Sequence, residues 1–210
     1  VCLADVYRNA AQTVQLACGN GVVDPGEQCD DGNVVDGDCC SSGCEFEALG
    51  SDCTDGNACT IDDACDGAGT CAGDAAPQTG CRGPTGAGSA SFFMRDQTDN
   101  AKDSLSWKWA KGEQTLLGEF GNPLATTGFT LCVFDRAGGS PARMSSETVP
   151  AGASCGAESC WTALGDRGFR FRDASNRFDG IRSIVLKPGD AGKAKIIVKG
   201  KGENLGLPSL

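Results

Sequence analysis

Histidine is absent from this chain, and aromatic residues make up only 6% of its 210 residues. Without imidazole, the catalytic triads and zinc sites that depend on histidine are excluded. No apolar run approaches the ~18 residues that a membrane-spanning helix needs, so we expect no membrane span. The net charge of −10 argues against nucleic acid as a partner, because phosphate binding requires an excess of Lys and Arg.

Basic residues are nearly missing from the first part of the chain. Residues 1–81 contain fifteen acidic residues and one basic residue, Arg8, whereas residues 82–210 contain thirteen acidic and seventeen basic residues. The first part also holds eleven of the fourteen cysteines. Such asymmetry predicts two domains of different physical character.

The fold class that we expect is mostly β, with a small disulfide-rich N-terminal domain of little regular structure and a C-terminal antiparallel β-sandwich. We place an N-terminal arm or helix at 1–17, the acidic repeat domain at 18–81, a Gly/Pro/Ser-rich linker at 82–91 and the β-sandwich at 92–210.

The cysteine spacing favours disulfides over zinc ligands. The sequence has no CxxC pair, and a small acidic domain with few apolar residues needs covalent bridges in place of a large core. Disulfides require an oxidising compartment, and the chain begins at Val1 without an initiator Met. We therefore expect a secreted protein, extracellular or on the cell surface.

The two domains hold eleven and three cysteines, both odd numbers. Complete pairing would therefore need a bridge between domains or between molecules, and otherwise two thiols stay free. The cysteines that we expect in disulfides are Cys18, Cys29, Cys40, Cys44, Cys53, Cys59, Cys65, Cys71, Cys155 and Cys160.

A short acidic motif occurs twice in the first domain, as Cys29-Asp30-Asp31-Gly32-Asn33 and, 24 residues later, as Cys53-Thr54-Asp55-Gly56-Asn57. Ca²⁺ prefers carboxylate, amide and carbonyl oxygens, and this many like charges in a small domain would otherwise repel one another. The alternative is that these residues are solvated acids that form Asx turns. The spacing is not that of an EF-hand. The candidate calcium ligands are Asp30, Asp31, Asn33, Asp36, Asp38, Asp55, Asn57, Asp62 and Asp63.

Residues 18–33 read CGNGVVDPGEQCDDGN and are followed by Asp36-Gly37-Asp38, Cys40 and Cys44. This pattern resembles the cysteine-rich repeat of large secreted bacterial proteins, especially those of myxobacteria, and more loosely the Lin-12/Notch repeat, which binds Ca²⁺. Residues 53–71 resemble the CxDGNxCT modules often found beside it. The resemblance covers about residues 18–73 and implies an extracellular module with structural or interaction roles and no catalysis. Cys39 stands where the pattern has Gly, and we expect it to pair with Cys2 or Cys81.

Alternation of apolar and polar residues marks the second domain. Without a convincing helix, this pattern predicts an antiparallel β-sandwich. We expect strands at Leu105–Trp109, Phe129–Phe134, Phe169–Arg172, Ile181–Lys187 and Lys195–Lys199. Cys155 and Cys160 should close a small loop. The stretches TLCVFD at 130–135, CW at 160–161 and KGKG at 199–202 resemble an uncharacterised β-rich region of secreted bacterial proteins, which implies localisation only.

Catalysis has little support in the sequence, so we expect no enzyme. There is no nucleotide-binding glycine motif, and no histidine could activate a nucleophile. A glycosidase needs only two carboxylates about 5–10 Å apart, but scattered surface acids are the commoner explanation of those in the second domain. The acids available there include Glu113, Glu119, Asp135, Glu147, Glu158 and Asp166.

Self-assembly is the function that we favour. The net charges of −14 for residues 1–81 and +4 for residues 82–210 favour head-to-tail contacts between copies, which can propagate into a surface filament or layer. The alternative is a carbohydrate-binding module, in which Trp107 and Trp109, on one strand face, would contact the glycan. The same spacing more often marks a hydrophobic core.

Overall fold

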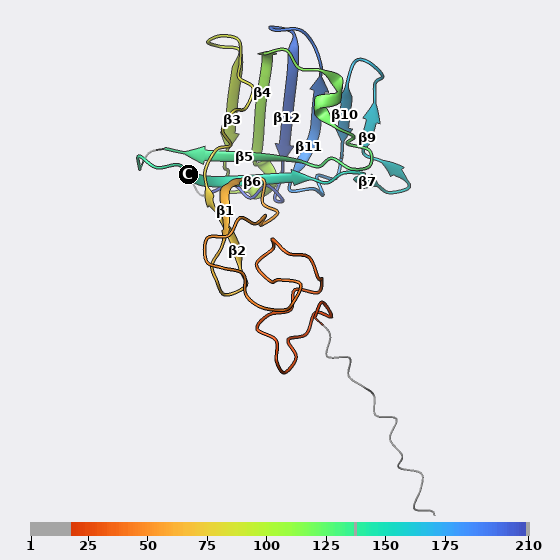
Figure 1. Ribbon diagram of the computed structural model, residues 1–210. Coiled ribbons are helices and arrows are strands. Elements are labelled where there is room, and N and C mark those ends of the chain that lie inside the picture. The colour runs from red at the N-terminus through yellow and green to blue at the C-terminus, as the bar shows by residue number, and fades with distance from the viewer. Residues whose placement is uncertain (1–17, 137, 209–210) are drawn as a thin grey trace, which may run out of the picture. The chain divides into compact units, whose positions relative to one another are not determined.

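The computed structural model describes residues 18–136 and 138–208 (Figure 1). The chain divides into two units, one ending at Asp74 and the other beginning at Ala75. Strands and irregular loops make up the described residues, which contain two short 3₁₀ helices, η1 (Asn100–Lys102) and η2 (Leu117–Phe120), and no α-helix. The mostly β fold class is thereby confirmed. The arm or helix expected at 1–17 lies outside the described residues.

The division between the units falls earlier than the linker that the composition suggested. Within the second unit, the Thr85 N–H donates to the Lys111 carbonyl (2.9 Å), and Pro84 forms an isolated bridge with Gly112. Ala90 and Ser91 already belong to a strand. The Gly/Pro/Ser-rich stretch predicted as a linker is therefore an ordered part of the second unit. Its backbone is paired with strand β4 (Ser104–Gly112), and such pairing does not require large side chains.

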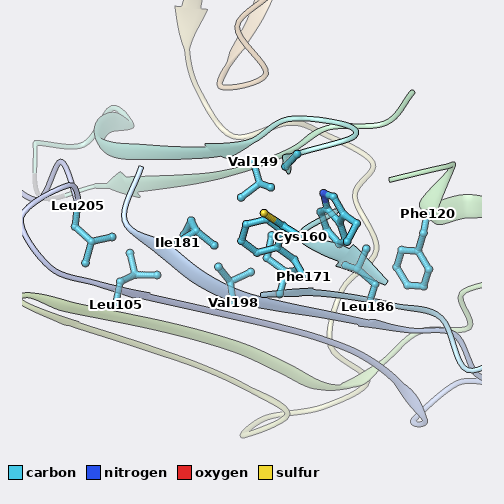
Figure 2. Close-up of a cluster of buried hydrophobic side chains, with 12 residues drawn as sticks. Leu105, Phe120, Val149, Cys160, Phe171, Ile181, Leu186, Val198 and Leu205 are labelled. Atoms are coloured by element: carbon cyan, nitrogen blue, oxygen red, sulfur yellow. The ribbon is translucent and has the colours of Figure 1, made fainter. Parts of the chain in front are cut away.

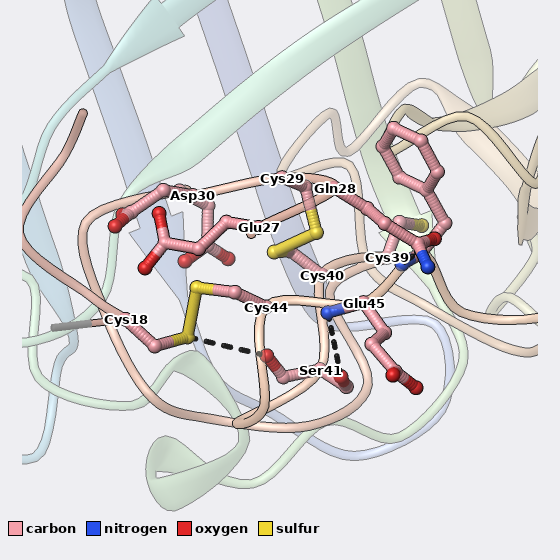
Figure 3. The surroundings of a disulfide bond; sticks show 12 residues. Cys18, Glu27, Gln28, Cys29, Asp30, Cys39, Cys40, Ser41, Cys44 and Glu45 are labelled. Carbon is pink, nitrogen blue, oxygen red and sulfur yellow. Dashed lines mark hydrogen bonds between the residues drawn. A yellow bond between two sulfur atoms is a disulfide. The ribbon is translucent and has the colours of Figure 1, made fainter. Parts of the chain in front are cut away.

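The N-terminal unit is built from loops, with one hairpin of strands β1 (Thr60–Cys65) and β2 (Cys71–Ala75). Its buried side chains are largely cysteines, and Cys29, Cys40 and Cys44 form a cluster against which Cys18 packs (Figure 3). Covalent bridges thus take the place of an apolar core, as expected for so small an acidic unit. The bridges within it are Cys18–Cys44, Cys29–Cys40, Cys39–Cys65 and Cys53–Cys71.

The expected pairing of Cys39 with Cys2 or Cys81 is wrong, because Cys39 is bonded to Cys65. That bridge ties the loop that follows the first acidic motif to the end of strand β1, which follows the second motif. Cys155 and Cys160 close the predicted small loop, and Cys59 and Cys132 are also disulfide-bonded. Among the described cysteines, Cys81 is a free, exposed thiol.

The C-terminal unit contains a six-stranded antiparallel sheet in the order β3-β4-β12-β11-β10-β9. A second hairpin, β5–β6, crosses these strands at a large angle, and β7–β8 forms a small third hairpin (Figure 1). The bounds are β3 Ala90–Arg95, β4 Ser104–Gly112, β5 Phe129–Asp135, β6 Ala142–Val149, β7 Ser154–Cys155, β8 Glu158–Ser159, β9 Trp161–Ala163, β10 Phe169–Arg172, β11 Ile181–Lys187 and β12 Ala194–Lys201. All five strands expected from alternation are present.

The hairpin β5–β6 packs on one face of the sheet, which we call the inner face. Figure 2 shows Val149 of β6 in the same buried cluster as Ile181, Phe171 and Val198. Because side chains alternate along a strand, residues between these inward positions point to the opposite, outer face. The period of two in the sequence therefore separates an apolar face from a polar one, as the alternation predicted.

Candidate functional site

The carboxylate of Asp30 organises the first acidic loop. Oδ2 accepts hydrogen bonds from the N–H groups of Gly19 and Asn20 (3.0 and 3.1 Å), and Oδ1 accepts from those of Gly21 and Gly32 (2.8 and 2.9 Å). Loss of solvent acts to raise the pKa of Asp30, but these four donors lower it below its ordinary value. Its four hydrogen bonds fill the usual acceptor positions of a carboxylate, so Asp30 holds the loop together.

The two acidic motifs adopt the same local structure. In the first, Asp31 accepts from the N–H of Asn33 (3.1 Å), and Asn33 accepts in turn from the N–H of Val35 (2.7 Å). In the second, Asp55 accepts from Asn57 (2.7 Å), and Asn57 accepts from Cys59 (3.0 Å). Each motif is therefore a pair of consecutive Asx turns, so the turn-forming role considered from the sequence is present in both.

Each motif also brings two carboxyl groups together. Asp38 interacts with Asp31, and Asp63 interacts with Asp55. In both pairs one oxygen, Oδ1 of Asp38 or Oδ1 of Asp63, is buried and has no hydrogen-bond partner among the described residues. A cation would complete the coordination of such an oxygen.

Of the other candidate ligands, Asn33 adjoins the first pair, since its side-chain amide donates to Oδ2 of Asp38 (3.0 Å). Asp36 accepts a hydrogen bond from the N–H of Ser42 (2.7 Å), and Asp62 is exposed at a left-handed position of β1 (φ 54°). Cysteine sulfurs close to Glu27 and Asp30, or grouped around Cys53, belong to disulfides and are not thiolate ligands. Among the nine predicted ligands, the structure thus brings together two carboxylate pairs.

Trp107 and Trp109 both lie on the inner face of β4, opposite Phe92 and Ala90 of β3. Trp109 is 5% exposed, and Trp107 packs against the hydrophobic cluster. Neither ring is therefore the flat exposed platform that a surface glycan would need. They do line a cavity of about 520 Å³, together with Arg82 and Glu119, which form an ion pair.

The outer face of the six-stranded sheet is strongly basic. Its six strands contain ten Lys and Arg residues and no acidic residue. One row across the outer face runs from Lys108 of β4 through Ile197 of β12 and Val185 of β11 to Arg170 of β10. The basic residues at outer-face positions, all exposed or half-buried, are Arg95, Lys108, Arg170, Arg172, Lys187, Lys195, Lys199 and Lys201.

This basic face was not among the sites predicted from the sequence. Its signal is present in Phe169-Arg170-Phe171-Arg172 and Lys195-Ile196-Ile197-Val198-Lys199, where every charge at an alternate position is positive. The net charge of the whole chain hides it, because the acids of the N-terminal unit outnumber these bases.

Comparisons with family models, curated proteins and solved structures find no match for this chain. In the part of the chain that the structure describes, no helix has the length and apolar character needed to span a membrane. The disulfides indicate an oxidising environment, as in extracellular proteins.

Proposed function

We propose that this protein is a non-catalytic extracellular structural protein whose copies assemble head to tail, into a filament or a layer. In this assembly the acidic N-terminal unit of one copy docks on the basic outer face of the next. The observation that carries the proposal is the separation of charge. Residues 18–74 contain fourteen acidic and no basic residues, whereas the six strands contain ten basic and no acidic residues.

Two unlike surfaces that attract each other form a heterologous contact, which propagates unless its rotation closes a ring. Complementary potentials speed the encounter and disfavour other pairings, while Phe93, Val185 and Ile197 supply apolar area between the charges. Phe93 is 56% exposed. The bridged N-terminal unit has few internal degrees of freedom to lose, so docking costs little conformational entropy.

Calcium is the cofactor that we propose for the N-terminal unit. The Asp31–Asp38 and Asp55–Asp63 pairs each offer a buried oxygen without a partner in the described chain, at equivalent places in the two motifs. Binding there would complete the coordination of these oxygens and fix the loops that present the acidic surface.

A carbohydrate-binding role is the second candidate. The observation that favours it is the cavity of about 520 Å³, where Trp107 and Trp109 lie with Arg82 and Glu119. Aromatic walls beside a few polar groups are typical of small-ligand sites. Binding on a glycan array that is lost in Trp107→Ala would support this role, and a retained signal would remove it.

The experiment that tests assembly is sedimentation velocity of the full chain at 50 mM and 500 mM salt, with negative-stain imaging of the same samples. We expect polymers at low salt that dissociate at high salt, since exposed charges are screened. In the triple variant Lys108→Glu, Lys195→Glu, Lys199→Glu, association should weaken at least tenfold. The matched variant Arg136→Glu, Arg143→Glu, Arg167→Glu changes the net charge equally at exposed positions outside the six strands and should still assemble.

The outcomes separate the parts of the proposal. Wild-type protein that stays monomeric under all conditions would overturn self-assembly. Polymers that form equally well in both triple variants would leave assembly standing and overturn the outer face as its docking surface.

A further inference from the structure

A buried carboxyl group lies between the hairpin β5–β6 and the sheet. Glu147 of β6 faces inward between Ser145 and Val149, opposite Leu131 of β5, and is 1% exposed. Neither of its carboxylate oxygens has a hydrogen bond of normal geometry among the described residues, and the polar group beside it is the Ser145 hydroxyl, which acts to lower the pKa of Glu147. Leaving a buried carboxyl unpaired costs stability, so an unpaired one in a folded protein needs an explanation.

The space beside Glu147 is a cavity of about 200 Å³. Apart from Glu147 and Thr130, its walls are apolar side chains, which include Ile184 and Val198 of the inner face. A cavity of about 150 Å³ can hold benzene, so this volume admits a six-membered ring with a short substituent. The cavity therefore has the size of a small-molecule site with one polar anchor.

A larger cavity shares walls with this one. Trp107, Phe129 and Ile196 form walls of both this cavity and the neighbouring cavity of about 520 Å³. The two spaces therefore adjoin, and the larger one has the Arg82–Glu119 ion pair on its wall.

We propose that the cavity beneath the β5–β6 hairpin binds a small apolar primary amine, with its ammonium group paired to Glu147 and its hydrocarbon body against Trp107, Phe129 and Ile184. An ammonium donates up to three hydrogen bonds, and its positive charge balances the negative charge of the carboxylate. The apolar walls contribute by burial of the hydrocarbon. This site is independent of the docking surface, which lies on the opposite face of the sheet.

The charges around Glu147 define how binding depends on pH. The inner positions of β4, β11 and β12 that face the hairpin are apolar, and β5 contributes Leu131 and Thr130. The charged group that acts on Glu147 is Asp179, just before β11, which accepts a hydrogen bond from the N–H of Thr148 (2.8 Å). Burial raises the pKa of Glu147 to about 7, Ser145 lowers it, and Asp179 adds to the rise. Amine binding, which needs the ionised form, should therefore strengthen about tenfold from pH 6 to pH 8.

The test uses phenethylamine and its neutral isostere 2-phenylethanol as probes, with calorimetry of the full chain at pH 6 and pH 8. We expect the amine to bind at least tenfold more tightly than the alcohol at pH 8, with a change in tryptophan fluorescence from Trp107. Glu147→Gln should remove that preference and the pH dependence. Glu158→Gln, at an exposed position of β8, should retain both.

Three results would overturn the proposal. They are no binding of either probe, equal binding of the amine and the alcohol to the wild type, and an unchanged preference for the amine in Glu147→Gln. The comparison of the two probes uses wild-type protein, so it decides the question whether or not the variant folds.

Discussion

Lys187 of β11 and Lys195 of β12 lie directly opposite each other on the outer face of the sheet. Like charges at such cross-strand positions are destabilising by a few tenths of a kcal/mol to about 1 kcal/mol. The six strands contain no acidic residue that would offset this repulsion. In the assembly that we propose, the acidic unit of the next copy offsets it.

The first prediction concerns this pair. Lys195→Glu should place opposite charges across β11 and β12 and stabilise the C-terminal unit by about 0.5–1 kcal/mol, while it weakens self-association. Urea unfolding measures the first effect and sedimentation velocity the second. Arg167→Glu, at an exposed position outside the strands, makes the same charge change and should alter neither by a comparable amount. If the Lys195 variant were less stable and assembled normally, repulsion between Lys187 and Lys195 would not destabilise the sheet, and Lys195 would not contribute to association.

The strands of the C-terminal unit could be predicted because their signal is local. Phe169–Arg172 alternates in sequence, Ile181–Lys187 is rich in β-branched and apolar residues, and the two form β10 and β11 with the same bounds. The face on which each side chain lies could also be predicted, since Ile196 and Val198 point inward and Lys195 and Lys199 point outward. Alternation sets the face of each residue, and the strand period needs no knowledge of the neighbours.

The pairing of Cys39 and the environment of Glu147 could not be predicted in this way. Cys39 meets Cys65 because loops of unrelated sequence bring them together, and sequence spacing does not determine loop paths. Glu147 shares a strand face with Ser145 and Val149, and its neighbours Ser146 and Thr148 are polar too, so the sequence does not show which face is buried. The same holds for the candidate calcium ligands, where backbone donors occupy Asp30 and leave Asp38 and Asp63 with a buried oxygen.

The second prediction concerns Asp30. Asp30→Asn should loosen the first loop, because a neutral amide oxygen is a weaker acceptor than the carboxylate that now receives four N–H groups. We expect faster limited proteolysis within residues 18–44, with no change in the tryptophan fluorescence of the C-terminal unit. Because the pKa of Asp30 is below its ordinary value, its stabilisation is present at neutral pH and should be lost only as the pH falls below about 4. Equal proteolysis of the variant and the wild type would show that other contacts hold the loop.

The third prediction concerns calcium. If Ca²⁺ completes the Asp31–Asp38 and Asp55–Asp63 pairs, EGTA should lower the melting temperature of the N-terminal unit, and added Ca²⁺ should restore it. The double variant Asp38→Asn, Asp63→Asn should lose this response, whereas Asp62→Asn, which alters an exposed acid, should keep it. Metal analysis of the native protein measures the stoichiometry. No bound ion, together with no response to EGTA, would leave both pairs as turn-forming acids only.

The fourth prediction concerns the bridge between Cys39 and Cys65, which encloses a loop of 26 residues in sequence separation. Removing it with Cys39→Ser, Cys65→Ser frees the unfolded chain and should cost the N-terminal unit about 3 kcal/mol. Cys155→Ser, Cys160→Ser removes a bridge of separation 5 in the other unit and should cost it less. Proteolysis rates of the two units, followed by mass spectrometry, distinguish these effects. A larger loss from the shorter bridge would contradict this ranking.

The last prediction concerns the pH dependence of stability. The pKa of Glu147 is raised from 4.5 to about 7 in the folded chain, so below pH 4.5 the group is protonated in both states and carries no penalty. As the pH rises from about 4.5 to about 7, the unfolded chain ionises while the folded one keeps its proton. Stability therefore falls through this window, by at most about 3 kcal/mol.

Glu147→Gln should remove this fall, so that the variant gains stability relative to wild type at pH 8 and not at pH 4. Urea unfolding followed by tryptophan fluorescence measures it, because Trp107, Trp109 and Trp161 all belong to the C-terminal unit. Glu158→Gln is the control at an exposed position and should keep the wild-type slope. If the wild type and Glu147→Gln had the same pH profile, Glu147 would be solvated, and the cavity beneath the hairpin would lack the unpaired carboxyl that selects an amine.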